Sequence, residues 1–259
     1  MVAMSSLTHD SISLRGADIV RISQQKKGHR FTLDSLLLAD FCRIKPRDRI
    51  LEPGAGTGVI SILLAKNHPS VRITAIEMHP PVAELARMNI SHNNLTTRIT
   101  LLEQDIRTLK RSLQPESFDA IIANPPYTKA GSGRRSPSAS RQIARHDESA
   151  DIGAWLDVQC FLKNKGRYNL IFPAARTVEL VSLMRAKNLE PKRARFIHPY
   201  QDRPASLVLI EAVKTAGAGL EILPPLFVHE HGGAYSEEMK KIYTHPPKHK
   251  SYFFPIAVS

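Results

Sequence analysis

An alternation of strand-like and helix-like segments is the feature that most constrains the fold of this chain. Short apolar runs rich in valine and isoleucine are separated by stretches with apolar residues at helical spacing. The pattern predicts strands at residues 49–52, 71–76, 99–102, 118–123, 168–172, 195–198 and 207–213, and helices at 32–41, 59–66, 81–89, 152–162 and 178–187. Strands that alternate with helices form parallel sheets covered on both faces, so we expect an α/β fold with a doubly wound sheet.

Composition indicates a basic, soluble protein. The 259 residues carry 36 Lys and Arg against 24 Asp and Glu, a formal net charge of +12, which makes a polyanion a candidate partner. We expect one domain over 1–259, with an N-terminal hairpin and helix in 1–45 and a C-terminal arm in 217–259. No apolar run is long enough for a membrane span and no secretory leader precedes the domain, so we expect a cytoplasmic location. The two cysteines and the scattered histidines match no metal-binding spacing, so no metal is expected.

A glycine-rich loop joins the first expected strand to its helix. It runs from Glu52 through Gly54, Gly56 and Gly58, where missing side chains would let backbone approach a ligand closely. A structural tight turn is the alternative. Glu77 ends the next strand, where a carboxylate can accept hydrogen bonds from both hydroxyls of a ribose, unless it is simply a solvated strand end. The loop matches neither the dinucleotide fingerprint nor the phosphate-binding P-loop.

A second candidate site directly follows the fourth strand of the sheet. Asn124 offers a carbonyl oxygen, and the prolines Pro125 and Pro126 stiffen the turn, so the Pro125 carbonyl can be held as a second acceptor. Two acceptors on one planar amino group would orient it and leave its nitrogen lone pair available. Tyr127 supplies an aromatic face on which a base could stack. The alternative is an ordinary proline-rich turn.

Together these motifs resemble the class I S-adenosylmethionine (SAM)-dependent amino methyltransferases. The segments 25–39, 144–147, 203–205 and 233–238 are further similar to pieces of the bacterial tRNA-Val adenine-N6 methyltransferases, with Asp147 in place of the usual glutamate. The resemblance covers nearly the whole chain. It implies a Rossmann-like sheet of seven strands, mostly parallel, with an antiparallel closing strand. It also implies that the helix within 1–45 is a lid over SAM.

The resemblance assigns a role to each candidate site residue. The implied catalytic residues are Asn124, Pro125, Pro126 and Tyr127. The implied cofactor-binding residues are Phe31, Thr32, Leu33, Glu52, Gly54, Ala55, Gly56, Gly58, Glu77, Met78, Asp105, Ile106 and Asn124. The implied substrate-binding residues are Tyr127, Arg134, Arg135, Arg141, Arg145 and His146. Asp105 would accept a hydrogen bond from the adenine amino group of SAM.

The expected activity is methyl transfer from SAM to an adenine N6 in tRNA, near the anticodon, by a monomer or homodimer. The segment 163–203 adds ten basic residues against three acidic ones, and we expect this charge to position RNA phosphates. Three alternatives stay open. They are methylation of another exocyclic amino group in ribosomal RNA, methylation of a protein glutamine amide, and RNA binding without catalysis.

Overall fold

The computed structural model describes residues 7–14, 19–25, 33–126 and 152–243. Its strands are β1 Leu7–Ile12, β2 Val20–Gln25, β3 Arg49–Pro53, β4 Arg72–Glu77, β5 Ile99–Glu103, β6 Phe118–Ala123, β7 Leu162–Pro173, β8 Leu189–His198, β9 Leu207–Lys214, β10 Glu221–Ile222 and β11 Leu226–Phe227. Its helices are α1 Leu33–Phe41, α2 Val59–Asn67, α3 Pro80–His92, α5 Ile152–Asp157, α6 Thr177–Ala186 and α7 Glu237–Ile242, and its 3-10 turns are η2 Ile106–Arg111, η3 Val158–Phe161 and η4 Ala174–Arg176.

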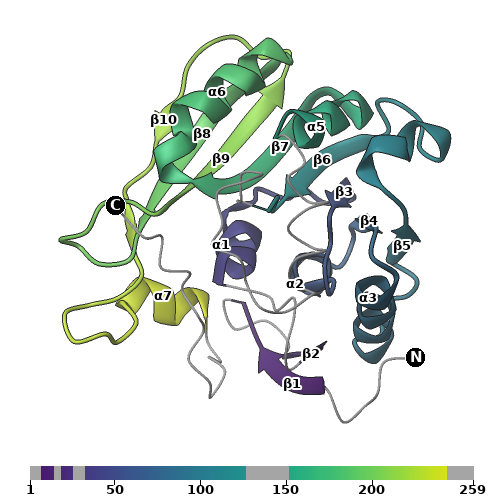
Figure 1. The fold of residues 1–259 in the computed structure, drawn as a ribbon, viewed down its shortest axis with the longest axis horizontal. Helices are drawn as coiled ribbons and strands as arrows, with labels where there is room; N and C mark the ends of the chain where they lie inside the picture. The colour runs from purple at the N-terminus through teal and green to yellow at the C-terminus, as the bar shows by residue number, and fades with distance from the viewer. Residues whose placement is uncertain (1–6, 15–18, 26–32, 127–151, 244–259) are drawn as a thin grey trace, which may run out of the picture.

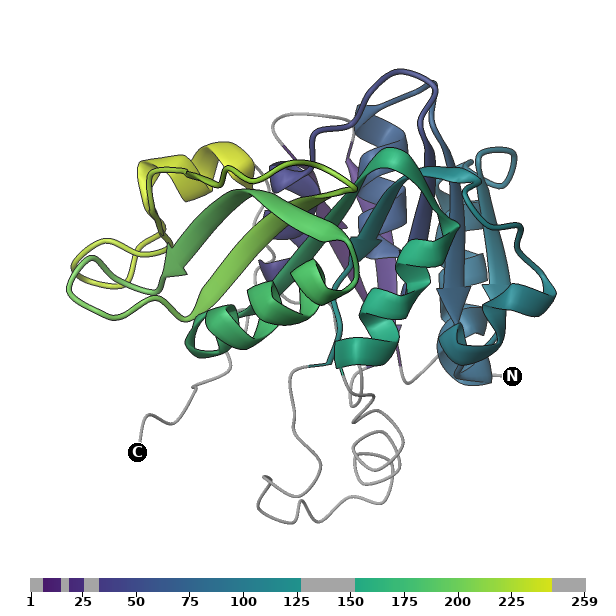
Figure 2. The same cartoon turned by 90° about the horizontal axis from the view of Figure 1, so that it is seen from above.

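A central sheet organises the molecule, with α5 and α6 over one face and α1, α2 and α3 over the other (Figures 1 and 2). Its main path is β10-β8-β9-β7-β6-β3-β4-β5, and β11 pairs with β8. Strand β9 runs antiparallel to both β7 and β8, whereas the other pairs are parallel. The doubly wound sheet with an antiparallel closing strand is therefore confirmed. Strands β10 and β11 add two short pairings that the sequence pattern does not predict.

The chain reverses its winding direction at β3. It runs outward from β3 through β4 to β5 and then crosses back to β6, which lies on the other side of β3. Ligands of open α/β sheets bind at such a switch point, beyond the carboxyl ends of the strands. The glycine loop after β3 and the Asn124 turn after β6 both lie at this edge.

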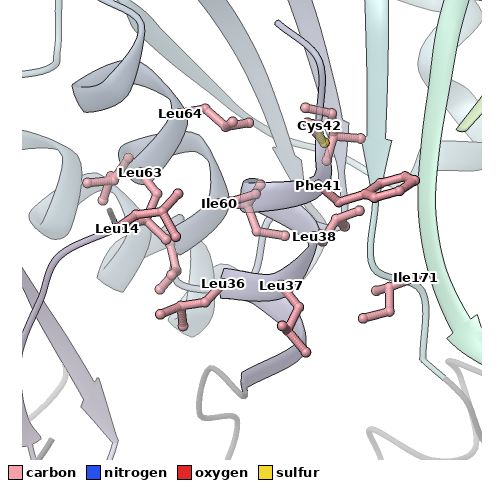
Figure 3. Packing of buried hydrophobic residues seen from close by; sticks show 14 of the residues in the cluster. Leu14, Leu36, Leu37, Leu38, Phe41, Cys42, Ile60, Leu63, Leu64 and Ile171 are labelled. Carbon is pink, nitrogen blue, oxygen red and sulfur yellow. The ribbon is translucent and has the colours of Figure 1, made fainter. Parts of the chain in front are cut away.

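Helix α1 is buried on nearly all sides. Seven of its nine residues are buried. In Figure 3, Leu36, Leu37 and Leu38 of α1 lie in one apolar cluster with Leu63 of α2 and Ile171 of β7. The apolar residues of α1 lie on several sides of the helix and give no clear amphipathic period, which fits its packing against α2, β7 and α7.

Two buried arginines fix the segment at the end of α1 to the sheet. Arg167 of β7 is paired with Asp48 at 2.6 Å and also donates to the Arg43 carbonyl. Arg193 of β8 is paired with a glutamate of β9 at 3.1 Å, and its Nη2 donates to the Phe41 carbonyl at 2.9 Å. Both residues belong to the basic segment expected to face RNA. Their burial corrects that expectation for these two, because a buried charge must be paired.

The boundaries of other elements also differ from expectation. The helix predicted over 152–162 ends at Asp157, and the following apolar residues form one 3-10 turn before β7 begins at Leu162. This early start lets Leu162 pair with Phe118 of β6. The expected C-terminal arm contains α7, and Tyr243 beyond it forms a bridge with Leu14 next to the hairpin.

The described helices include none long and apolar enough to cross a membrane.

Candidate functional site

The glycine loop connects β3 to α2 through three left-handed residues. Gly54, Gly56 and Gly58 have φ values of +67°, +57° and +83°, a region that residues with side chains rarely adopt. A Cβ placed on Gly56 would meet no atom within 4 Å, so the loop faces open space there. A Cβ on Gly54 would lie 2.3 Å from the Trp155 ring. The loop is thus open at Gly56 and tightly packed at Gly54.

Glu77 joins this loop to the end of β4. The amide of Ala55 donates to the Ile76 carbonyl at 2.7 Å, and the amide of Gly56 donates to Glu77 Oε2 at 2.9 Å. The other oxygen, Oε1, accepts from the His79 amide at 2.9 Å. Glu77 is 6% exposed. A carboxylate has about four acceptor positions, so holding two amides is compatible with accepting hydrogen bonds from a ribose.

Asp105 lies at the neighbouring end of β5. The Gln104 amide donates to the Glu77 carbonyl at 3.0 Å, which ties the ends of β4 and β5 together. The Asp105 carboxylate accepts from the Arg107 amide at 2.9 Å and from the Arg107 guanidinium. These hydrogen bonds lower the pKa of Asp105, so the group is an ionised acceptor at neutral pH. Met78 is exposed beside this edge, and Ile106 is half-buried.

Glu52 is a buried residue of β3 just before the glycine loop. It is 2% exposed and accepts a hydrogen bond from the Ser61 hydroxyl of α2. Burial raises the pKa of Glu52 to about 8, against a partial lowering by Ser61, so the neutral acid predominates at pH 7. Its contacts are those of a group that supports the loop.

The segment expected to hold an amino group follows β6. Asn124 is half-buried, Pro125 is buried and Pro126 is half-buried. Strands β6 and β3 are adjacent and parallel, with Ile121 opposite Leu51. The Asn124 turn and the Gly54 turn therefore leave neighbouring strands at the same edge. The geometry brings the carbonyl acceptors expected for an amino group next to the loop expected to hold the cofactor.

The described residues include only part of the predicted site. Leu33 is the buried first residue of α1. The predicted site residues that lie outside the described ranges are Phe31, Thr32, Tyr127, Arg134, Arg135, Arg141, Arg145 and His146. Within the described ranges, no cluster of three or more His, Cys, Asp or Glu side chains could hold a metal ion.

Sequence reasoning missed several side chains that hold the site in shape. Trp155 packs on Gly54, Ser61 bonds Glu52, and Arg107 holds Asp105. Asn89 of α3 donates to the Thr57 carbonyl in the glycine loop at 3.0 Å. The Arg107 contact could have been predicted, because a basic residue two positions after the acid is a local signal. The other three contacts depend on which helix packs against which strand.

Relatives among known proteins match most of the chain. The model of the methyltransferase small domain matches residues 30–148. A tRNA1(Val) (adenine(37)-N6)-methyltransferase of Vibrio campbellii is 27% identical over 84% of this chain and 88% of that protein. Proteins of the same name are 30% identical in Tolumonas auensis, over 73% of this chain and 78% of that protein, and 28% identical in Porphyromonas gingivalis, over 85% and 89%.

Solved structures share the fold at lower identity. A protein of Agrobacterium tumefaciens described as a predicted O-methyltransferase superposes with a TM-score of 0.67 and 23% identity, over 81% of this chain and 95% of that one. A geranyl diphosphate C-methyltransferase of Streptomyces coelicolor, in complex with S-adenosyl-L-homocysteine, superposes with a TM-score of 0.51 and 13% identity, over 70% of this chain and 74% of that one. These likenesses concern the fold. The sequence relationship goes further, and by it this chain belongs to the family of the tRNA1(Val) (adenine(37)-N6)-methyltransferases.

Proposed function

We propose that this protein transfers the methyl group of SAM to the exocyclic N6 of an adenine in tRNA, with adenine 37 of tRNA1(Val) as the expected target. The proposal rests mainly on one observation. The Asn124 turn leaves β6 beside the glycine loop of β3, in a chain related over most of its length to enzymes named for this reaction.

The residues around the glycine loop fit SAM. Gly56 faces open space that a side chain would fill, and Glu77 lies at hydrogen-bond distance from its amide. Glu77 would accept from the ribose hydroxyls, and Asp105 from the adenine amino group, with Met78 and Ile106 against the adenine ring. When bound, SAM supplies a methyl group activated by its sulfonium.

The Asn124 turn would hold the target base after it has left the RNA stack. The Asn124 side-chain oxygen and the Pro125 carbonyl would accept from the two hydrogens of the adenine amino group. This arrangement fixes the plane of the amino group and leaves the nitrogen lone pair directed at the methyl group. Alignment of the two reactants supplies much of the rate, so a strong general base is not required.

Exposed basic residues of the closing half of the sheet, defined as β7, β8 and β9, would contact RNA phosphates. Strand β8 runs in the same direction as β7, so the turn after β8 lies at the same edge of the sheet as the Asn124 turn. Arg203 is exposed in this turn, and its carbonyl bonds His198. An arginine at this position would anchor the phosphate backbone without reading the base.

The test is methylation of total RNA and of unmodified tRNA with radiolabelled SAM, followed by nucleoside analysis. We expect N6-methyladenosine in tRNA. Asn124→Ala should abolish turnover while calorimetry still detects SAM binding. Asn164→Ala, at the amino end of β7 and away from the site, is the matched control and should keep full activity. Label in protein or in another nucleoside would contradict the proposal.

A further inference from the structure

The N-terminal hairpin is attached to α3 in an unusual way. Strand β2 pairs with β1 along one edge. Along the other edge, the side chains of Asn89 in α3 and of Asn93, which directly follows α3, form hydrogen bonds with its backbone. Asn93 Oδ1 accepts from the Arg21 amide at 3.1 Å, and its Nδ2 donates to the Arg21 carbonyl at 2.8 Å. Asn89 repeats the pattern on Ser23, at 2.8 and 3.0 Å.

The spacing explains why a helix can take the place of a strand here. Residues four apart on a helix are separated by about 6 Å along its axis. Residues two apart on a strand are separated by about 6.8 Å. The amides of Asn89 and Asn93 therefore meet alternate residues of β2, and each presents one acceptor and one donor as a neighbouring strand would.

The two asparagines differ in their remaining hydrogen. The second amide hydrogen of Asn93 goes to the Asn89 carbonyl in the last turn of α3, at 2.8 Å. The second amide hydrogen of Asn89 goes to the Thr57 carbonyl, at 3.0 Å. Thr57 lies between Gly56 and Gly58 in the glycine loop. Asn89 is fully buried, so these hydrogen bonds are shielded from solvent.

We infer that Asn89 is a positioning residue for the cofactor: it fixes the glycine loop against the N-terminal hairpin. The inference rests on the proposed function, because it needs the loop to hold SAM. Loss of the Asn89 side chain would leave the buried Thr57 carbonyl without this donor. The backbone of Gly56 and Gly58 would then lose a constraint on the orientation that the ligand needs.

The coupling also operates in the opposite direction. A ligand that orders the glycine loop strengthens the bond from Asn89, and the same side chain holds Ser23 of β2. By thermodynamic linkage, SAM should then stabilise the hairpin to the degree that the hairpin stabilises SAM binding. The hairpin in this way contributes to the affinity for SAM through Asn89.

The experiment compares Asn89→Ala with Asn93→Ala in the full chain. Each substitution removes two hydrogen bonds to β2, so both should lower the melting temperature to a similar degree. Only Asn89→Ala removes the bond to the glycine loop. We expect Asn89→Ala to raise the calorimetric Kd and the KM for SAM about tenfold, with kcat at saturating SAM within about threefold of wild type. Asn93→Ala should leave the Kd for SAM within about twofold.

An equal rise in Kd for both variants, or no rise for Asn89→Ala, would overturn the inference. Failure of the wild-type protein to bind SAM would instead contradict the proposed function. If the alanine variants unfold at the assay temperature, the same pair is assayed in the cold with sucrose, which favours the folded state without supplying the lost hydrogen bonds.

Discussion

The ligand edge of the sheet and its closing half use charged residues in opposite ways. At the ends of β4 and β5, the carboxylates of Glu77 and Asp105 accept hydrogen bonds from backbone amides beside an open loop. In the closing half, Arg167 and Arg193 lie inside the strands, buried and paired. A charge at a strand end can serve a ligand, whereas a charge within a strand must be neutralised by the protein itself. Substitutions should therefore separate cofactor affinity from stability.

The largest expected effect is on stability, in the closing half. Asp48→Ala leaves the Arg167 guanidinium buried without its partner and should lower the free energy of unfolding by about 3–5 kcal/mol. The Kd for SAM of the folded protein should not change. Urea unfolding and calorimetry measure the two quantities. Asp157→Ala removes an exposed partner of Lys187 and is the control, with a loss below about 1 kcal/mol. A large change in Kd for Asp48→Ala would contradict the contrast between the two regions.

The second effect is a pH dependence at the ligand edge. Native Glu52 has a pKa of about 8, whereas the unfolded chain ionises near the ordinary value of 4.5. The unfolded state therefore gains ionisation between these values, and stability should fall by a few kcal/mol as pH rises from about 4.5 to about 8. Glu52→Gln cannot ionise at this position. Its free energy of unfolding, relative to that of the wild type, should therefore increase across this pH range. Urea unfolding at each pH measures this difference. If the difference in free energy of unfolding between the two proteins does not change with pH, the raised pKa of Glu52 is contradicted.

The third prediction separates two glycines of one loop. Gly56→Ala meets no atom and carries only backbone strain of about 1–2 kcal/mol, but it fills the space expected to hold SAM, so the Kd for SAM should rise at least about tenfold. Gly54→Ala adds a collision with Trp155 and should lose more stability than Gly56→Ala. Unfolding curves and calorimetry on both variants test the pair. Wild-type affinity in Gly56→Ala would show that the open space is not the cofactor site.

The smallest effect is expected for Arg107→Ala. The Arg107 side chain is 63% exposed, so its pair with Asp105 should contribute less than about 0.5 kcal/mol to stability. The Kd for SAM should rise by less than about threefold, because the Arg107 backbone amide still holds Asp105. Asp105→Ala removes the acceptor itself and should raise the Kd for SAM more than Arg107→Ala does. Equal Kd values for the two variants would indicate that Asp105 acts only through Arg107.

Local patterns predicted the main strands of the sheet and the candidate residues at their carboxyl ends. The alternation of periods predicted β6 at residues 118–123, where the structure has it, and β9 to within one residue, but it predicted only the last four residues of β8. The glycine loop was predictable because its residues are adjacent in sequence. What was missed depends on packing between distant segments. Asn89 and Thr57 are 32 positions apart, and nothing in either neighbourhood indicates their contact.

Charge was the least predictable feature for a similar reason. A basic residue in a strand reads alike whether it faces solvent or a buried acid. Arg167 pairs with Asp48 from 119 positions away, so its burial depends on the packing of β7 against the segment after α1. The sequence located the excess of positive charge but could not divide it between structure and RNA binding.

The contact between Trp155 and Gly54 gives the protein a built-in optical reporter. Trp155 is the sole tryptophan of the chain, and its ring lies against Gly54 of the glycine loop. Its emission therefore reports on the surroundings of this loop without an attached dye and without signal from any other indole. Rapid mixing with SAM can then follow loop ordering in real time, before any RNA is added.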